Sequence, residues 1–177
     1  MNKKVLFITD TLEELDLKKD TSILMMEESI KLGFDVYQCL VEDLYAENSE
    51  VIVFAKKITT VSTSEIKFED ASTHSIKTFE YSFMRKDPPV DEDYINALHL
   101  LGLAQAMGTK VFNNPVSIKE FNEKVFAIHF AKYIPETLIS SKIDKIKSFI
   151  KDKKEIVVKP LAVSYTHLRA HETSFHL

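Results

Sequence analysis

Hydrophobic and polar residues at the start of the chain alternate in a pattern that predicts a strand, a helix and a second strand. The apolar run 5–8 predicts the first strand, and apolar residues then recur at helical spacing over 21–32. Asp20 is suited to cap the start of this helix and Gly33 to end it. Residues 34–40 predict the second strand. Such a βαβ unit implies parallel strands with a ligand site at their carboxyl ends.

The middle of the chain predicts further strands and one long helix. β-Branched residues over 51–61 favour an extra hairpin or edge strands, and the Ser/Thr-rich segment 62–80 is expected to wrap the surface. Residues 81–84 and 110–112 predict two more strands, with a helix over 92–107 between them. Three large residues share the predicted buried face of this helix: Tyr94, Leu98 and Leu101.

A capping-box pattern predicts where the next helix begins. Ser117 is followed three residues later by Glu120, so we expect a helix from there to about Ala131. Three apolar residues mark its predicted inward face: Phe121, Val125 and Ile128. Beyond it, the pattern predicts a strand at 137–140, a helix over 143–150 and a strand over 155–161.

Composition excludes several classes of function. The net charge of −4 and pI near 5.9 provide no broad positive field for nucleic acid, and no apolar run is long enough to cross a membrane. Only three glycines occur, which excludes an intact P-loop or G-x-G-x-x-G cradle. The single cysteine, Cys39, cannot close an intrachain disulfide and is expected to be a packing residue. We therefore expect a globular protein of the cytoplasm.

Four short motifs place charged residues at predicted loops and element ends. They are Leu17-Lys18-Lys19-Asp20-Thr21-Ser22, Met84-Arg85-Lys86-Asp87-Pro88-Pro89, Asn122-Glu123-Lys124 and Val158-Lys159-Pro160-Leu161. In this order they closely resemble the bacterial glutathione synthetases, a family of ATP-grasp ligases. The likeness covers about residues 1–161, and the motif at 84–89 is the most specific part of it.

The resemblance implies an α/β fold with two parts. Residues 1–121 would form a Rossmann-like pre-ATP-grasp domain with a parallel sheet, and residues 122–161 would open an ATP-grasp domain. We expect an N-terminal fragment that holds no catalytic residues and no ligands for the family's Mg²⁺, and that does not turn over. The full-length family is typically homo-oligomeric.

The same resemblance implies the chemistry. The family uses ATP and Mg²⁺ to join γ-glutamylcysteine to glycine through an acyl phosphate. Lys124 and Lys159 match its nucleotide-contacting lysines, and Arg85 and Lys19 are the expected substrate contacts. The expected partners are thus small molecules, with neither nucleic acid nor a membrane involved.

Taken without the resemblance, these residues allow simpler interpretations. Arg85 directly follows a predicted strand, where it could grip a carboxylate with two hydrogen bonds or pair with Asp87 to order the loop. Lys159 could be a strand-end lysine whose ammonium reaches water, and Lys124 an ordinary surface lysine. Asp10 follows the first strand, but it lacks the clear acidic partners that a phosphorylatable aspartate needs.

The tail over 162–177 departs from the family pattern. It contains no glycine where the family has a glycine-rich lid loop, and it holds three of the six histidines. We interpret it as foreign to the protein. The alternative is a metal site, because His167 and His171 are four residues apart.

Two other functions stay open at the level of sequence. One is a non-catalytic Rossmann-like module for binding or oligomerisation, and the other is a different ATP-grasp peptide ligase. The lone histidines on predicted helices, His99 and His129, have no companion that would make a catalytic pair.

Overall fold

The computed structural model describes residues 2–151, 153, 155–161 and 168–170. The chain divides into two compact units, Met1–Glu120 and Phe121–Leu177. Each unit has its own secondary structure and is described by itself. None of the described helices is long and apolar enough to cross a membrane.

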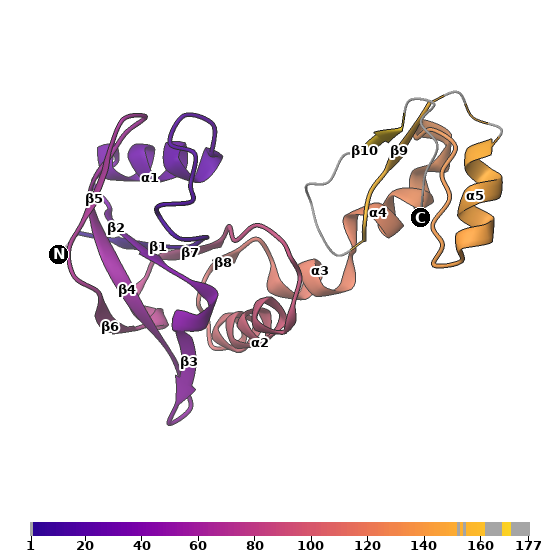
Figure 1. Ribbon diagram of the computed structural model, residues 1–177. Helices are drawn as coiled ribbons and strands as arrows, with labels where there is room; N and C mark the ends of the chain where they lie inside the picture. Colours follow the sequence, from indigo (N-terminus) through magenta and orange to yellow (C-terminus); the bar gives the residue numbers. More distant parts are fainter. Residues whose placement is uncertain (1, 152, 154, 162–167, 171–177) are drawn as a thin grey trace. The chain divides into compact units, whose positions relative to one another are not determined.

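The first unit is built on a mixed sheet with a parallel centre, as the βαβ pattern predicts (Figure 1). Its main strand order is β3-β4-β2-β1-β7-β8. The parallel strands are β1 (Lys4–Ile8), β2 (Asp35–Cys39), β7 (Tyr81–Met84) and β8 (Val111–Phe112). The α/β fold is therefore confirmed.

Helix α1 (Thr21–Lys31) covers one face of this sheet. Its start is set by Asp20, whose carboxylate accepts a hydrogen bond from the Ser22 backbone N–H at 2.6 Å. Beyond its last turn the chain adopts a positive φ of 83° at Gly33, which glycine tolerates best. Ile23 and Met26 of the helix are buried against the strands.

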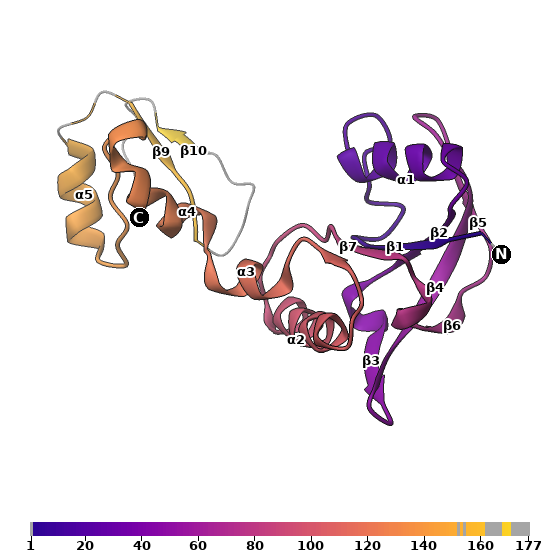
Figure 2. The same ribbon diagram turned by 180° about the vertical axis from the view of Figure 1, so that it is seen from behind.

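Helix α2 (Glu92–Ala106) covers the opposite face (Figure 2). Asp91 caps it by accepting a hydrogen bond from the Tyr94 N–H at 3.0 Å. The predicted inward residues are confirmed, because Tyr94, Leu98 and Leu101 are all buried against the sheet. The two helices therefore make the first unit a three-layer structure.

The long antiparallel strand β4 (Glu50–Val61) organises the segment that the sequence left least defined. It pairs with β2 and with three short strands: β3 (Leu44–Glu47), β5 (Ile66–Phe68) and β6 (Ser72–Ser75). The hairpin option is thus confirmed. The prediction that 62–80 wraps the surface holds for most of the segment, but Ile76 and Phe79 are 1% and 3% exposed in the core beneath α2.

The predicted single helix from Ser117 is also wrong. Helix α3 (Pro115–Glu120) starts two residues earlier, because Asn114 accepts a hydrogen bond from the Ser117 N–H at 3.0 Å and proline suits a first helical turn. The following pieces are α4 (Glu123–Phe126) and the 3₁₀ helix η3 (Ala127–Tyr133).

The residues expected on its inward face are exposed instead. Phe121, Val125 and Ile128 are 50%, 46% and 42% accessible. Asn122 interrupts the helix because its side chain accepts from the N–H groups of Lys124 and Val125, which makes it a new N-cap. The apolar spacing therefore does not continue on a single helix face.

The rest of the second unit follows the predicted order with shorter strands. Helix α5 (Ile143–Lys151) is confirmed, whereas 137–140 forms no strand. Strand β9 (Ile156–Val158) ends before Lys159 and pairs antiparallel with β10 (Leu168–Ala170). His167 and His171, the alternative metal site, lie outside the described residues, as does most of the tail interpreted as foreign.

The buried face of α2 gives a stability test. Replacing Leu98 with alanine should lower the free energy of unfolding by about 2–5 kcal/mol, because it leaves a cavity against the sheet. Leu103 is on the same helix but is 44% exposed, so Leu103→Ala should cost well under half as much. Urea unfolding followed by circular dichroism measures both. Equal losses would contradict the packing described for α2.

Candidate functional site

The direction of the connections in the first unit leaves an opening between the ends of two central strands. From β1 the chain passes through α1 to β2 on one side, and from β7 it passes through α2 to β8 on the other. Since α1 and α2 cover opposite faces, the carboxyl ends of β1 and β7 form the point where the strand order reverses. Open α/β sheets bind ligands at such a point.

Arg85 leaves β7 at this opening and is held by the start of α1. Its backbone N–H donates to the Ile8 carbonyl at 2.8 Å, which continues the pairing of β7 with β1. Its guanidinium donates from Nη2 to Thr21 Oγ1 at 2.6 Å and from Nε to Ser22 Oγ at 3.4 Å. A guanidinium has five N–H donors, so three are left to bind an anion.

Asp10 fixes the loop that comes after Arg85. One of its carboxylate oxygens lies 2.5 Å from Lys86 Nζ, and the other accepts a hydrogen bond from the Asp87 backbone N–H at 3.0 Å. The alternative was an ion pair between Arg85 and Asp87, and the described residues form no such pair. Asp10 is therefore the loop's anchor, and the two adjacent prolines at 88–89 stiffen the rest of the loop.

Asp87 carries a destabilised negative charge in this cluster. Burial, followed by the charges of Asp10 and Asp20, raises the pKa of the Asp87 carboxyl, although Arg85 and Lys86 act in the opposite direction. The folded chain therefore holds a proton on Asp87 at pH values where the unfolded chain has lost it.

Lys19 lies beside α1 but has a different partner. Its ammonium is 3.6 Å from an Asp16 carboxylate oxygen, and its side chain is 85% exposed. No hydrogen bond or ion pair among the described residues joins Lys19 to Arg85. Its expected role toward the substrate stays a prediction.

The second unit joins the two segments that carry the predicted nucleotide lysines. Asn122 donates from its side-chain amide to the Leu161 carbonyl at 3.3 Å. Asn122 stands two residues before Lys124, and Leu161 stands two residues after Lys159. The hydrogen bond thus draws the start of α4 and the segment after β9 together.

The two lysines differ in their surroundings. Lys124 is 16% exposed, with its ammonium 3.0 Å from Glu123, whereas Lys159 is exposed just beyond β9. The prediction that Lys159 lies on the strand is wrong, since pairing ends at Val158. Within the described part of the chain, no cluster of three His, Cys, Asp or Glu residues could hold a metal ion.

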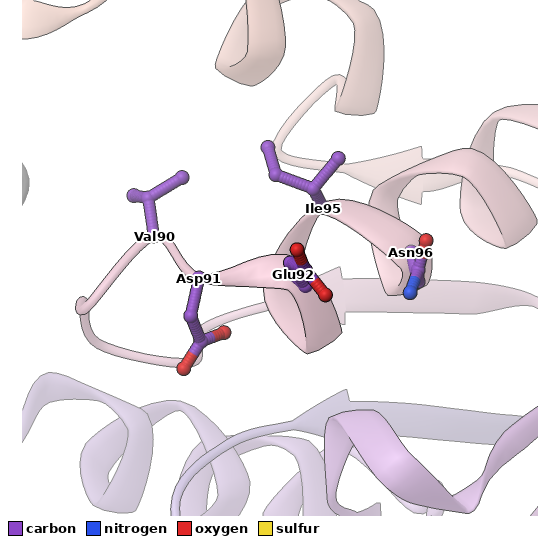
Figure 3. A pocket seen from close by; sticks show the side chains of 5 residues that line it. All are labelled: Val90, Asp91, Glu92, Ile95 and Asn96. Atoms are coloured by element: carbon purple, nitrogen blue, oxygen red, sulfur yellow. The ribbon is translucent and has the colours of Figure 1, made fainter.

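An open pocket of about 380 Å³ lies where α2 begins (Figure 3). Val90 and Ile95 point to one side of it and Asp91 points away from them. The lining also includes Glu92 and Asn96, so it carries two carboxylates and no cation. These charges disfavour a phosphate there.

The comparisons with known proteins agree with the two-unit organisation. Residues 3–119 match the N-terminal domain of prokaryotic glutathione synthetase, and residues 123–166 match the ATP-grasp domain of the same enzyme. The chain belongs to the prokaryotic glutathione synthetase family. The resemblance carried by the four sequence motifs is thereby confirmed.

Similar relatives named glutathione synthetase come from several organisms. The Parasynechococcus marenigrum protein is 32% identical over 88% of this chain and 50% of its own length. The Prochlorococcus marinus protein (strain MED4) is 34% identical over 89% and 51%, and the Neisseria meningitidis protein is 32% identical over 89% and 52%. The chain spans about half the length of the curated relatives it matches.

The partners of Arg85 are what sequence reasoning missed in this glutathione synthetase domain. The sequence marks Thr21 and Ser22 only as part of a motif, and Asp10 only as an acid at the carboxyl end of the first strand, where a ligand site is expected. Hydroxyl groups in the first turn of a helix that follows a strand end were the available signal. The contacts of Arg85 with α1 and of Asp87 with Asp10 join residues that are 63 to 77 positions apart, so a local sequence pattern could not predict them.

The raised pKa of Asp87 gives a prediction with a definite sign. The ordinary pKa of an aspartate is 3.8, and the pKa of Asp87 in the folded chain is higher. As the pH rises through these two pKa values, ionising Asp87 lowers the stability of the folded chain. Asp87→Asn should therefore raise the thermal unfolding midpoint at pH 7, and the difference should vanish below the ordinary value.

Asp16→Asn is the matched control, for which the expected shift of the unfolding midpoint has the opposite sign. A backbone hydrogen bond from Lys18 lowers the pKa of Asp16, so the ionised group contributes stability that is lost as the pH falls through the folded pKa. This variant should lower the midpoint at pH 7. A shift of constant size for Asp87→Asn at every pH would contradict the assignment.

Proposed function

We propose that this chain supplies the peptide-binding domain and the opening of the nucleotide-binding domain of a glutathione synthetase. This enzyme joins γ-glutamylcysteine to glycine at the expense of ATP. Family membership supports the reaction class. The structural observation that carries the proposal is the Arg85 guanidinium, which is held at the opening of the sheet with donors to spare.

The proposed reaction sets the charges that the protein must meet. The γ-phosphoryl group of ATP passes to a carboxylate oxygen of the peptide, and the glycine nitrogen then attacks the acyl carbon as phosphate leaves. Mg²⁺ would neutralise charge on the nucleotide phosphates when bound. The described residues provide no cluster for that ion, so their proposed work is to bind and orient.

Arg85 is proposed to bind a carboxylate of γ-glutamylcysteine. A planar guanidinium can grip a carboxylate with two parallel hydrogen bonds, which fixes direction as well as position. Thr21 and Ser22 already restrict its rotation, so less side-chain entropy is lost on binding. Lys19, on the loop before α1, is proposed as a second, more mobile contact for the peptide.

The positive charge of this cluster is partly offset by acids. Lys86 is paired with Asp10, and Asp20 caps α1, so the acid with the least stabilised charge near Arg85 is Asp87. Removing that charge should favour an anionic peptide. This arrangement gives Asp87 a different expected effect on binding from Arg85.

Lys124 and Lys159 are proposed to bind the phosphates of ATP. The link between Asn122 and Leu161 holds their segments together, and ammonium groups are ordinary phosphate ligands. The family resemblance further supports a cytoplasmic enzyme that acts on small molecules and assembles as a homo-oligomer.

Calorimetric titration with γ-glutamylcysteine tests the peptide site. Arg85→Lys keeps the charge but loses the planar fork, and it should weaken binding about tenfold or more. Asp87→Asn should strengthen binding, and both effects should diminish with added salt. Lys110→Met is the control: it removes a surface lysine that pairs with Glu80, and it should leave peptide binding unchanged. Unchanged affinity in Arg85→Lys would refute the peptide site.

Fluorescence titration with a labelled ATP analogue tests the nucleotide lysines. Lys159→Met should weaken binding about tenfold, because one phosphate contact is lost. Lys151→Met, at the end of α5, should leave it unchanged. Equal affinities for the two variants would remove Lys159 from the proposed site.

A further inference from the structure

A second, smaller pocket opens on the α1 side of the sheet in the first unit. It has a volume of about 180 Å³, and its floor is formed by β2 and β4. Gln38 on β2 is directly opposite Lys56 on β4 in the strand register, and Phe54 follows on the same face of β4. Thr11, Leu12 and Glu13, from the loop after β1, line it as well.

The floor is polar where the same sheet face is otherwise apolar. On β2, the residue two positions before Gln38 is Val36. On β4, the residue two positions after Lys56 is Ile58. Both are buried in the core under α1. Gln38 is itself only 3% exposed. Gln38 is thus a buried polar side chain, and it lies where the face begins to open to solvent, since Lys56 is partly exposed and Phe54 is 46% exposed.

Gln38 uses only half of its hydrogen-bonding capacity within the described chain. Its amide nitrogen donates to Thr9 Oγ1 at 3.1 Å and to the Asp10 carbonyl at 3.2 Å. These bonds fix the amide so that its oxygen is the free end, and that oxygen accepts no hydrogen bond from the described residues. This oxygen is open to solvent, so it can accept an N–H of a ligand in place of water.

The charged groups of the pocket have opposite signs. The Lys56 ammonium lies 4.5 Å from the centre of the Phe68 ring and forms no ion pair among the described residues. Glu13 is likewise without an ion pair in that part of the chain, and one oxygen of Asp43 is occupied by the Leu40 N–H at 2.8 Å, which leaves the other. A ligand that carries one negative and one positive charge can pair with both Lys56 and the two carboxylates.

We infer that this pocket binds a small α-amino acid. Its carboxylate pairs with Lys56, and its ammonium donates to the Gln38 amide oxygen and to the acidic wall of Glu13 and Asp43. Gln38 and Lys56 hold directly opposite register positions on β2 and β4, and both line the pocket. An apolar side chain of the amino acid packs on Phe54, which is 46% exposed.

A nuclear magnetic resonance titration of the whole 177-residue chain with L-valine tests the inference. Saturable shifts are expected for the backbone amides of Gln38, Phe54 and Lys56. Two analogues test the need for both charges: 3-methylbutanoate lacks the ammonium group and 2-methylpropan-1-amine lacks the carboxylate. Each should bind at least about tenfold more weakly than valine.

Variants locate the site and separate it from the peptide site. Lys56→Met should weaken valine binding about tenfold, whereas Lys57→Met, on the opposite face of β4, should leave it unchanged. Gln38→Met is a second variant with the same expected loss. Arg85→Lys should leave valine binding unchanged, so failure of either proposal is recognised independently.

Three results would overturn the inference. They are the absence of saturable shifts with valine, equal binding of valine and either analogue, and equal losses in Lys56→Met and Lys57→Met. The amide spectrum of each variant shows whether the sheet is intact.

Discussion

The reversal of strand order between β1 and β7 is the constraint on which the candidate site depends. Because α1 and α2 leave toward opposite faces, neither helix covers the ends of these two strands. The loop after β7 would be free at this point without a tether. Asp10 supplies it by binding both Lys86 and the Asp87 N–H, and the α1 hydroxyl groups orient Arg85.

Sequence patterns predicted the elements that carry their own boundary signals. The first helix lies between Asp20 and Gly33, and the buried face of α2 follows directly from its apolar spacing. The errors arose where distant residues decide the outcome. Ile76 and Phe79 enter the core because β6 pairs with β4. The Ser/Thr-rich sequence of this segment does not predict that pairing.

The site shows the same division. Arg85 could be singled out from its place after a strand, but its partners on α1 and the anchoring role of Asp10 needed the folded chain. At the end of the first unit, Asn114 takes the capping role that the sequence assigned to Ser117, and Asn122 caps the next helix in the second unit. Asparagine side chains accept backbone N–H groups as readily as serine does, so the local pattern was ambiguous.

The central claim is that the Arg85 guanidinium binds a peptide carboxylate. The chain has two arginines, Arg85 and Arg169, so the Nε–H signal of Arg85 can be assigned by its loss in Arg85→Lys. Nitrogen-15 magnetic resonance during addition of γ-glutamylcysteine is the most direct measurement. A saturable shift of that signal is predicted, because the carboxylate binds the remaining Nη donors of the same guanidinium while Ser22 holds the Nε–H. Peptide binding that leaves it unmoved, or no binding at all, would contradict the account.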